Sequence, residues 1–230
     1  MLFVVPTNLQ AQTGVKELGF GGLLKTNGVG LSFTRTVNKS DKIANYFYSD
    51  FVSHKHIKES KVVNHKAENK MPYVFGKQFH TAIARTAFGF SKPLVRPIFP
   101  NGLSIDIQGG IGLSMACQRP VYLRVQTVAN DQSTIEIVKY SSTSVSSAQE
   151  IIGYAKNGEG WDELIYKPGV LLKMETSFTW NDFDQLAKRI HIGASVDYFP
   201  KGLSIMSFGE NPRITPTFFV GIMWVVNKGV

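Results

Sequence analysis

Residues Gly102–Ser114 have the sequence GLSIDIQGGIGLS, in which apolar and polar positions alternate. The apolar residues fall on odd numbers and are Leu103, Ile105, Ile107, Ile111 and Leu113. The even numbers carry polar side chains or glycine, namely Ser104, Asp106, Gln108, Gly110, Gly112 and Ser114. A period of two predicts an extended strand with one apolar and one polar face. Soluble strands usually span about five or six residues and a tilted bilayer-crossing strand about ten, so the length predicts a membrane strand.

Similar alternation recurs elsewhere in the chain, although four aromatic residues leave the facing of one segment undecided. The further segments are 18–24, 29–37, 43–53 (the aromatic one), 79–90, 170–180, 189–198 and 214–226. Asn27-Gly28 separates the first two runs. Asn-Gly between alternating runs is a strong hairpin signal, because both central residues of that turn need positive φ. The pattern predicts an all-β fold of about eight antiparallel strands.

The lengths of the connections alternate. Short turns at 38–42, 91–101 and 181–187 would lie at one rim, and longer connections at 54–78, 116–168 and 200–213 at the other. Within the longest, 126–168 contains a serine-rich piece and is interpreted as irregular. Short turns at one rim and long loops at the other are the plan of a bacterial outer-membrane barrel. We therefore predict a closed up-and-down antiparallel transmembrane β-barrel.

A soluble lipocalin-like binding barrel is the alternative within the all-β class. Its inner face would be apolar and its outer face polar. Composition does not decide between the two arrangements, because the chain is 43% hydrophobic with a mean hydropathy of −0.05. A helical membrane protein is excluded, because no internal window offers the roughly 20 apolar residues that a spanning helix needs.

The charge and cysteine content point to no nucleic-acid partner and no cofactor. The net charge is +8, but the basic residues concentrate between Lys55 and Lys77 and are mixed with Glu59 and Glu68. Such a segment is typical of a solvated loop and not of a nucleic-acid-binding stripe. The single cysteine, Cys117, forms neither an internal disulfide nor a cysteine metal cluster.

The first residues, MLFVVPTNLQAQ, are interpreted as the remnant of a secretory signal peptide spanning residues 1–12. A short apolar run precedes Leu9–Gln12, which would serve as the processing region. Residues 13–230 then form a single barrel domain. An exported chain of this kind is expected in the bacterial outer membrane.

On the membrane interpretation, the polar faces of the strands point into the barrel. The predicted lumen network consists of Arg85, Asp106, Gln108, Lys173, Glu175, His191 and Asp197, and Thr34 also points inward. Opposite charges there would pair and plug the barrel, because unpaired buried charge is costly. The alternative is a narrow polar path through the lumen. The predicted lipid-facing aromatic girdle consists of Phe33, Phe178, Trp180, Tyr198, Phe218 and Trp224.

A catalytic interpretation has little support. Glu175, His191 and Asp197 could form a hydrolase-like set, but Ser177 and Ser195 are only two of many small inward residues. However, the sequence carries no nucleophile elbow, phosphate loop or histidine-pair metal helix. Four further histidines (His54, His56, His65 and His80) lack nearby cysteine or carboxylate clusters, so no metal site is predicted. We predict that the protein is not an enzyme.

Three segments resemble small outer-membrane β-barrel proteins of the Bacteroidota, a porin-like set. They are Gly19–Gly28, Tyr73–Lys77 and Pro120–Leu123, and their order and spacing resemble that set as well. The resemblance implies an outer-membrane barrel without an assigned chemistry. The chain departs from many such barrels at its end, Asn227–Val230, which is not aromatic.

These observations predict a structural or accessory subunit of a larger envelope complex. Its partners would be outer-membrane lipid and envelope proteins, the latter contacted through the long loops 54–78 and 116–168. A small porin-like transporter is the first alternative, and a lipid-modifying barrel enzyme is the second. Size favours the accessory role, because a filled eight-stranded lumen leaves no aqueous channel.

Overall fold

The computed structural model describes most of the chain. The described residues are 16–38, 43–56, 58–63, 72–96, 102–129, 132–140, 151–155, 158–180, 186–207 and 211–228. The predicted signal-peptide remnant (1–12) and the serine-rich piece (141–147) lie outside them. No helix among the described residues is long and apolar enough to cross a membrane.

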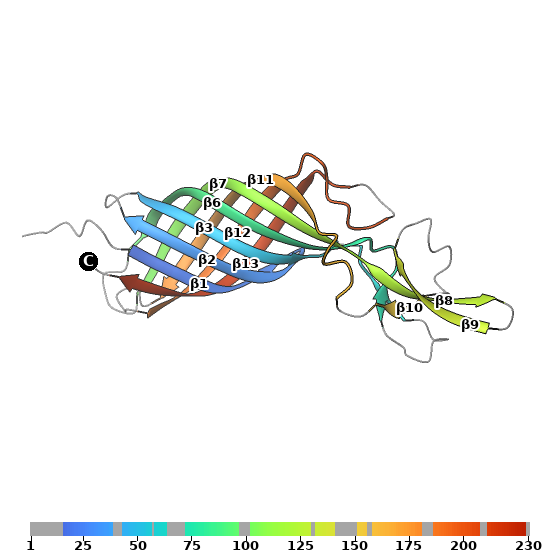
Figure 1. Cartoon of the computed structure of the whole chain (residues 1–230). Helices are drawn as coiled ribbons and strands as arrows, with labels where there is room; N and C mark the ends of the chain where they lie inside the picture. Colours follow the sequence, from blue (N-terminus) through green and yellow to red (C-terminus); the bar gives the residue numbers. More distant parts are fainter. Residues whose placement is uncertain are drawn as a thin grey trace, which may run out of the picture.

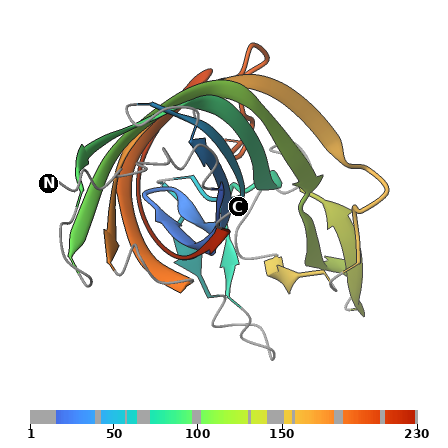
Figure 2. The ribbon, with the colours of Figure 1, turned by 90° about the vertical axis from the view of Figure 1, so that its left-hand side faces the viewer.

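Eight strands form a closed barrel in which every neighbouring pair is antiparallel (Figures 1 and 2). The strands are β1 (Lys16–Lys25), β2 (Gly28–Asn38), β3 (Ala44–His54), β6 (Phe79–Val95), β7 (Leu103–Pro120), β11 (Ile165–Trp180), β12 (Leu186–Tyr198) and β13 (Ile214–Lys228). Their order around the barrel is β1-β13-β12-β11-β7-β6-β3-β2. The predicted closed eight-stranded up-and-down barrel is confirmed.

The pairing register sets the tilt of the strands. Partners followed once around the barrel from Leu18 arrive at Pro216 on β13. The direct β1–β13 register pairs Leu18 with Val226, ten residues further along β13. A shear of this size in an eight-stranded barrel tilts the strands by roughly 40°. Ten residues at about 3.3 Å each, tilted by this angle, rise about 25 Å along the barrel axis, which is the height of the apolar band in outer-membrane barrels.

The two rims of the barrel differ, as predicted. The terminal rim holds the outer ends of β1 and β13 and the connections 39–43, 96–102 and 181–185. The loop rim holds the tight turn after β1 and the connections 55–78, 121–164 and 199–213. Two predicted connections were too long, because β6 continues to Val95 into the predicted turn 91–101, and β7 and β11 extend into the predicted loop 116–168.

The first hairpin turn is shifted by one residue from its predicted position. Lys25 pairs with Gly28, so the central residues of the turn are Thr26 and Asn27. Gly28 belongs to β2, where its φ is 156° and a Cβ would lie 1.7 Å from the carbonyl oxygen of Ser53. The glycine is therefore needed for close approach of β3, and not for the turn itself.

We expect Gly28→Ala to lower the free energy of unfolding by about 1–3 kcal/mol, because the backbone must shift to admit the methyl group. Gly22→Ala is the matched control, since a Cβ at Gly22 meets nothing within 4 Å. Urea-driven unfolding of the two variants in detergent micelles measures the difference. Equal stability of both variants would contradict the close approach.

The two faces of the barrel wall have opposite character. Outward residues are apolar and exposed, as in Ile111 and Leu113, whereas inward residues are polar and buried, as in Ser104 and Asp106. This is the arrangement of a membrane barrel and the reverse of a lipocalin. The soluble alternative was therefore wrong about which face points inward.

A small projecting structure stands beyond the loop rim (Figure 1). It contains a three-stranded sheet in the order β10-β8-β9, made of β8 (Tyr122–Ala129), β9 (Gln132–Lys139) and β10 (Ile151–Tyr154), and a two-stranded sheet of β4 (Lys61–Val62) and β5 (Tyr73–Val74). Only Val121 separates β7 from β8. Leu123, Ile151 and Tyr73 are buried in a core of its own. The interpretation of 126–168 as wholly irregular was therefore wrong.

The segment that follows β12 packs into the mouth of the barrel at the loop rim. Phe199, Leu203 and Ile205 are buried against the inward residues Ile83 and Ala116. The backbone of this segment is held as well, because the amides of Gln78 and Phe79 both donate to the carbonyl of Ile205. An apolar layer therefore covers the polar lumen from this side.

Candidate functional site

Arg85 is the centre of an ionic cluster in the half of the lumen nearer the loop rim. Its Nε and Nη2 donate to the Asp197 carboxylate at 2.9–3.0 Å, and its Nη1 donates to Asp50 at 3.2 Å. Lys25 donates to the other oxygen of Asp50 at 2.7 Å. All four charged side chains are at least 98% buried. Each charge therefore has an opposite charge within hydrogen-bond reach, which offsets its loss of hydration.

Glu175 is the centre of a second cluster. Lys173 Nζ lies 2.5 Å and His191 Nδ1 lies 2.9 Å from Glu175 Oε2, and the Tyr46 hydroxyl donates to Oε1. Lys173 Nζ also lies 3.6 Å from the centre of the Tyr48 ring, a cation–π arrangement. Tyr46 and Tyr48 lie on β3, the aromatic segment whose facing the sequence left undecided. The structure shows that both tyrosines point into the lumen.

Two further pairs occupy the half of the lumen nearer the terminal rim. Arg189 Nη2 donates to Glu17 at 2.8 Å, and its Nε donates to the Thr179 hydroxyl at 2.7 Å. At the rim itself, Arg96 lies 3.3 Å from Asp106, with the Arg96 side chain 48% exposed. This second pair is therefore partly open to water, unlike the clusters deeper in the barrel.

The predicted lumen residues fall into separate groups. Arg85 and Asp197 belong to the first cluster and Lys173, Glu175 and His191 to the second. Asp106 lies at the terminal rim, and Gln108 donates to Ser177 at 3.5 Å, the limit of a hydrogen bond. Thr34 is buried as well.

Several members of these clusters were missing from the predicted set, namely Glu17, Lys25, Tyr46, Tyr48, Asp50 and Arg189. Glu17 and Lys25 lie just outside the segment 18–24 that the alternation marked. Asp50 lies in the ambiguous aromatic segment. Its odd-even relation to Phe47 and Phe51 could have placed it on the inner face.

The lumen is balanced in charge along its length. Lys25, Arg85, Lys173 and Arg189 face Asp50, Asp197, Glu175 and Glu17. We expect no resolvable single-channel current in planar lipid bilayers, because side chains fill an eight-stranded lumen. Reproducible ohmic steps that persist after repurification and vanish in an Arg85 variant would contradict a plugged lumen.

The hydrolase-like set is only partly assembled. Glu175 contacts His191, but Asp197 is held by Arg85 and the Ser114 hydroxyl. His191 is 1% exposed, which leaves a water or lipid substrate no direct approach. In the described part of the chain, no group of three His, Cys, Asp or Glu side chains is placed to hold a metal ion.

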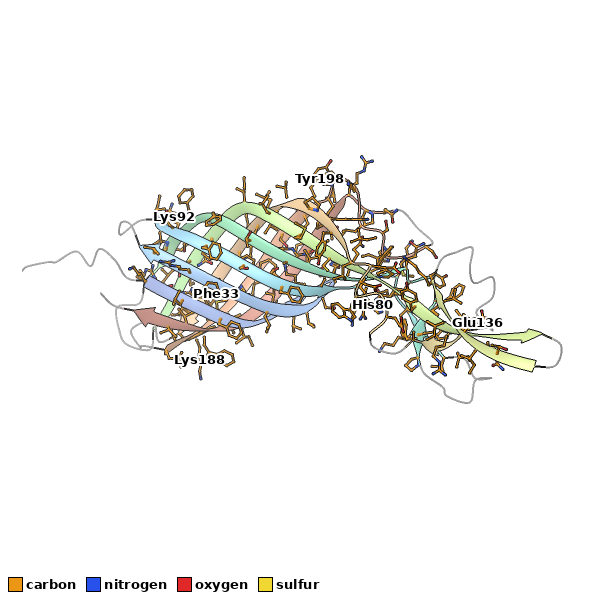
Figure 3. All side chains as sticks on the ribbon, viewed as in Figure 1. Phe33, His80, Lys92, Glu136, Lys188 and Tyr198 are labelled. Carbon is orange, nitrogen blue, oxygen red and sulfur yellow. The ribbon has the colours of Figure 1, made fainter. Side chains whose placement is uncertain are left out.

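The six predicted girdle aromatics all lie on the outward face of the barrel. Their exposed fractions include 37% for Phe33, 45% for Tyr198 and 67% for Phe218, and Phe178 is half-buried. Figure 3 shows Tyr198 near the loop rim and Phe33 about midway along the wall. Trp180 and Trp224 lie near the terminal rim, so aromatic side chains occur towards both rims, where the interfacial girdles of a membrane barrel lie.

The projecting sheet presents an apolar edge strand. In the order β10-β8-β9, strand β9 has a neighbour on one side only. Ile135 and Ile137, two residues apart on β9, are each 52% exposed. An exposed apolar edge strand offers unpaired backbone groups and side chains to a further strand.

Glu163 fastens the segment after β10 to this sheet. Its carboxylate accepts hydrogen bonds from Tyr122 on β8 and Lys139 on β9. The hydrogen bonds from Lys139 and Tyr122 hold the pKa of Glu163 below its ordinary value, and the same contact raises the pKa of Tyr122 to about 12. Close by, the Arg119 guanidinium lies 4.8 Å from the centre of the Trp161 ring.

Acidification is expected to loosen this fastening. Because the folded pKa of Glu163 is depressed, its contribution is present above the ordinary carboxyl pKa of about 4.3 and is lost as the pH falls through the lower folded value. Hydrogen-exchange protection factors of the β9 amides should fall over that range. In Glu163→Gln they should be lower at neutral pH and lose this pH dependence, and an identical profile would contradict the role.

The closed fold, with its polar inner face and apolar outer face, defines an eight-stranded antiparallel barrel of the membrane type. The chain is similar in structure to Ail, the attachment invasion locus protein of Yersinia pestis, solved with the heparin analogue sucrose octasulfate, at 8% identity and a TM-score of 0.41 (92% of this chain, 98% of Ail). It is also similar to Neisserial surface protein A, at 6% identity and 0.43 (94% and 96%). A third similar structure is the N-terminal β-barrel domain of Pseudomonas aeruginosa OprF, at 9% and 0.38 (95% and 100%). No protein-family model and no curated protein matches the chain.

Proposed function

We propose that this chain is an integral protein of the bacterial outer membrane that serves as a structural or accessory subunit of a larger envelope complex. The wall supports the membrane placement, because a band about 25 Å tall is apolar outside while the inner face is polar. The loop rim would face the cell exterior and the terminal rim the periplasm, since short turns of such barrels are periplasmic.

The docking role is proposed from the exposed edge strand of the projecting sheet, β9. Ile135 and Ile137 stand on β9, well away from the lipid-facing wall, so lipid does not cover them (Figure 1). A protein partner that adds a strand to β9 would bury both isoleucines and satisfy the free backbone groups. The buried ion pairs of the lumen support the same role, because an eight-stranded barrel is just wide enough for its inward side chains and offers little room for a porin-like channel.

Fractionation tests the placement. We expect the native protein in the outer-membrane fraction, with a mobility on denaturing gels that changes when the sample is boiled, as for a closed barrel that resists detergent until heated. Recovery of the folded protein from the soluble periplasmic fraction would overturn the placement.

Native gels of membranes extracted in mild detergent test the docking role. We expect the wild-type chain to migrate in an assembly larger than the monomer, and Ile135→Asp to release the monomer. Thr134→Asp is the matched control, since Thr134 is exposed on the same strand but on the opposite face, and it should leave the assembly intact. Release by both variants would indicate a damaged hairpin, and release by neither would exclude β9 as the docking edge.

A further inference from the structure

Acidic and basic residues of the barrel strands differ in where they lie. Every aspartate and glutamate in the eight strands is buried, namely Glu17, Asp50, Asp106, Glu175 and Asp197. Among the barrel residues whose side chains are described, the exposed charged residues are all basic, namely Lys16, Arg35, Lys92 and Lys188. All four lie close to the terminal rim, where Figure 3 shows Lys92 and Lys188. This rim therefore presents positive charge to its surroundings.

An outward groove lies beside two of these basic residues. It has a volume of about 660 Å³ and is lined by Lys16, Leu18, Phe33, Arg35, Phe47 and Phe88. Leu18, Arg35, Phe47 and Phe88 are successive register partners across β1, β2, β3 and β6, so they stand in one row on the outer wall. The lining that the structure describes therefore comes entirely from barrel strands.

The floor of the groove is aromatic and its rim-side end is cationic. The Phe47 ring lies 4.9 Å from the Phe88 ring and 6.4 Å from the Phe33 ring, centre to centre. Lys16 is the outermost residue of β1 on this face. Neither Lys16 nor Arg35 forms an ion pair with any residue that the structure describes. An unpaired arginine on a lipid-facing wall is costly unless it lies near the interface or meets an anion.

We propose that this groove binds one anionic phospholipid of the periplasmic leaflet. Its phosphate would lie between Arg35 and Lys16, and one acyl chain would lie along Phe47, Phe88 and Phe33. A guanidinium donates two parallel hydrogen bonds to phosphate oxygens, and the lysine adds a second positive charge. The inference rests on the membrane placement proposed above, because it needs the terminal rim to face the periplasmic leaflet.

Native mass spectrometry of the barrel released from nanodiscs tests the site. The nanodiscs contain equal amounts of phosphatidylglycerol and phosphatidylethanolamine. We expect one retained phosphatidylglycerol per barrel, and about thirtyfold weaker retention in Lys16→Gln/Arg35→Gln, from about a fivefold loss for each of the two charges. Lys92→Gln/Lys188→Gln is the matched control, because it removes two basic residues at the same rim that do not line the groove, and it should retain the lipid.

Other outcomes would overturn the inference. An equal loss in both double variants would indicate a diffuse basic rim without a built site, and equal retention of phosphatidylethanolamine would remove the preference for an anionic headgroup. A lipid-free dimer of the barrel would assign the groove to a second copy of the chain. Lys16→Arg/Arg35→Lys should retain phosphatidylglycerol, which separates loss of charge from misfolding. Failure here with the protein still in the outer-membrane fraction would leave the membrane placement intact.

Discussion

Arg85→Ala is expected to lower the free energy of unfolding of the barrel by about 3–5 kcal/mol, because it removes the partner of two buried carboxylates. Among the described residues, Asp197 would keep only the Ser114 hydroxyl, whereas Asp50 would keep Lys25 and Tyr48. Equilibrium unfolding in urea, followed by tryptophan fluorescence in detergent micelles, measures the change.

Two further variants test whether the loss of stability comes from unpaired buried charge. Gln108→Ala removes one contact at the 3.5 Å limit and should have a small effect. Arg85→Met/Asp197→Leu removes both members of the main ion pair and leaves Asp50 paired with Lys25, so it should cost less than Arg85→Ala alone. If the single and double variants were equally unstable, the loss would come from the volume of Arg85 and not from stranded charge.

The second large effect is expected for Glu175→Ala, again about 3–5 kcal/mol, because the buried Lys173 ammonium loses its counter-charge. Lys173 would keep the Tyr46 hydroxyl at 3.1 Å and the Tyr48 ring. Neither partner carries a full negative charge.

Lys173→Met/Glu175→Leu should recover much of this loss, since it removes the stranded charge together with its partner. Thr217→Ala is a control for the same lumen, because the Thr217 hydroxyl is buried and has no hydrogen-bond partner in the described part of the chain. A Glu175→Ala barrel as stable as Thr217→Ala would show that water reaches Lys173.

The strands and their faces were predictable because a strand repeats every two residues. In the stretch 102–114 the predicted facing is confirmed, with Ile111 67% exposed and Gln108 3% exposed. The same parity indicated that Lys173 and Glu175 lie on the inner face. The facing could not be predicted between Tyr46 and Phe51, where apolar and polar residues do not alternate clearly. A tyrosine there can point to either face, because its ring is apolar and its hydroxyl is polar.

The partners within the lumen were not predictable. Arg85 and Asp197 are 112 residues apart in the chain, and their contact depends on shear and tilt, which no local pattern encodes. The packing of Phe199 and Leu203 into the barrel mouth depends on the same long-range geometry. The sheet beyond Pro120 was not predicted, because the serine-rich piece at 141–147 in the same connection is typical of irregular structure and the alternation in 132–139 is short.

The continuity of β7 with the projecting hairpin has a mechanical consequence. β7 is paired on both sides, through sixteen residue pairs with β6 and sixteen with β11. A pull on the hairpin along the strand would load these hydrogen bonds in shear, all at once, and not one after another as in unzipping. The strand can thus anchor a load applied beyond the loop rim, and the projecting sheet should unravel at a lower force than the wall that holds it.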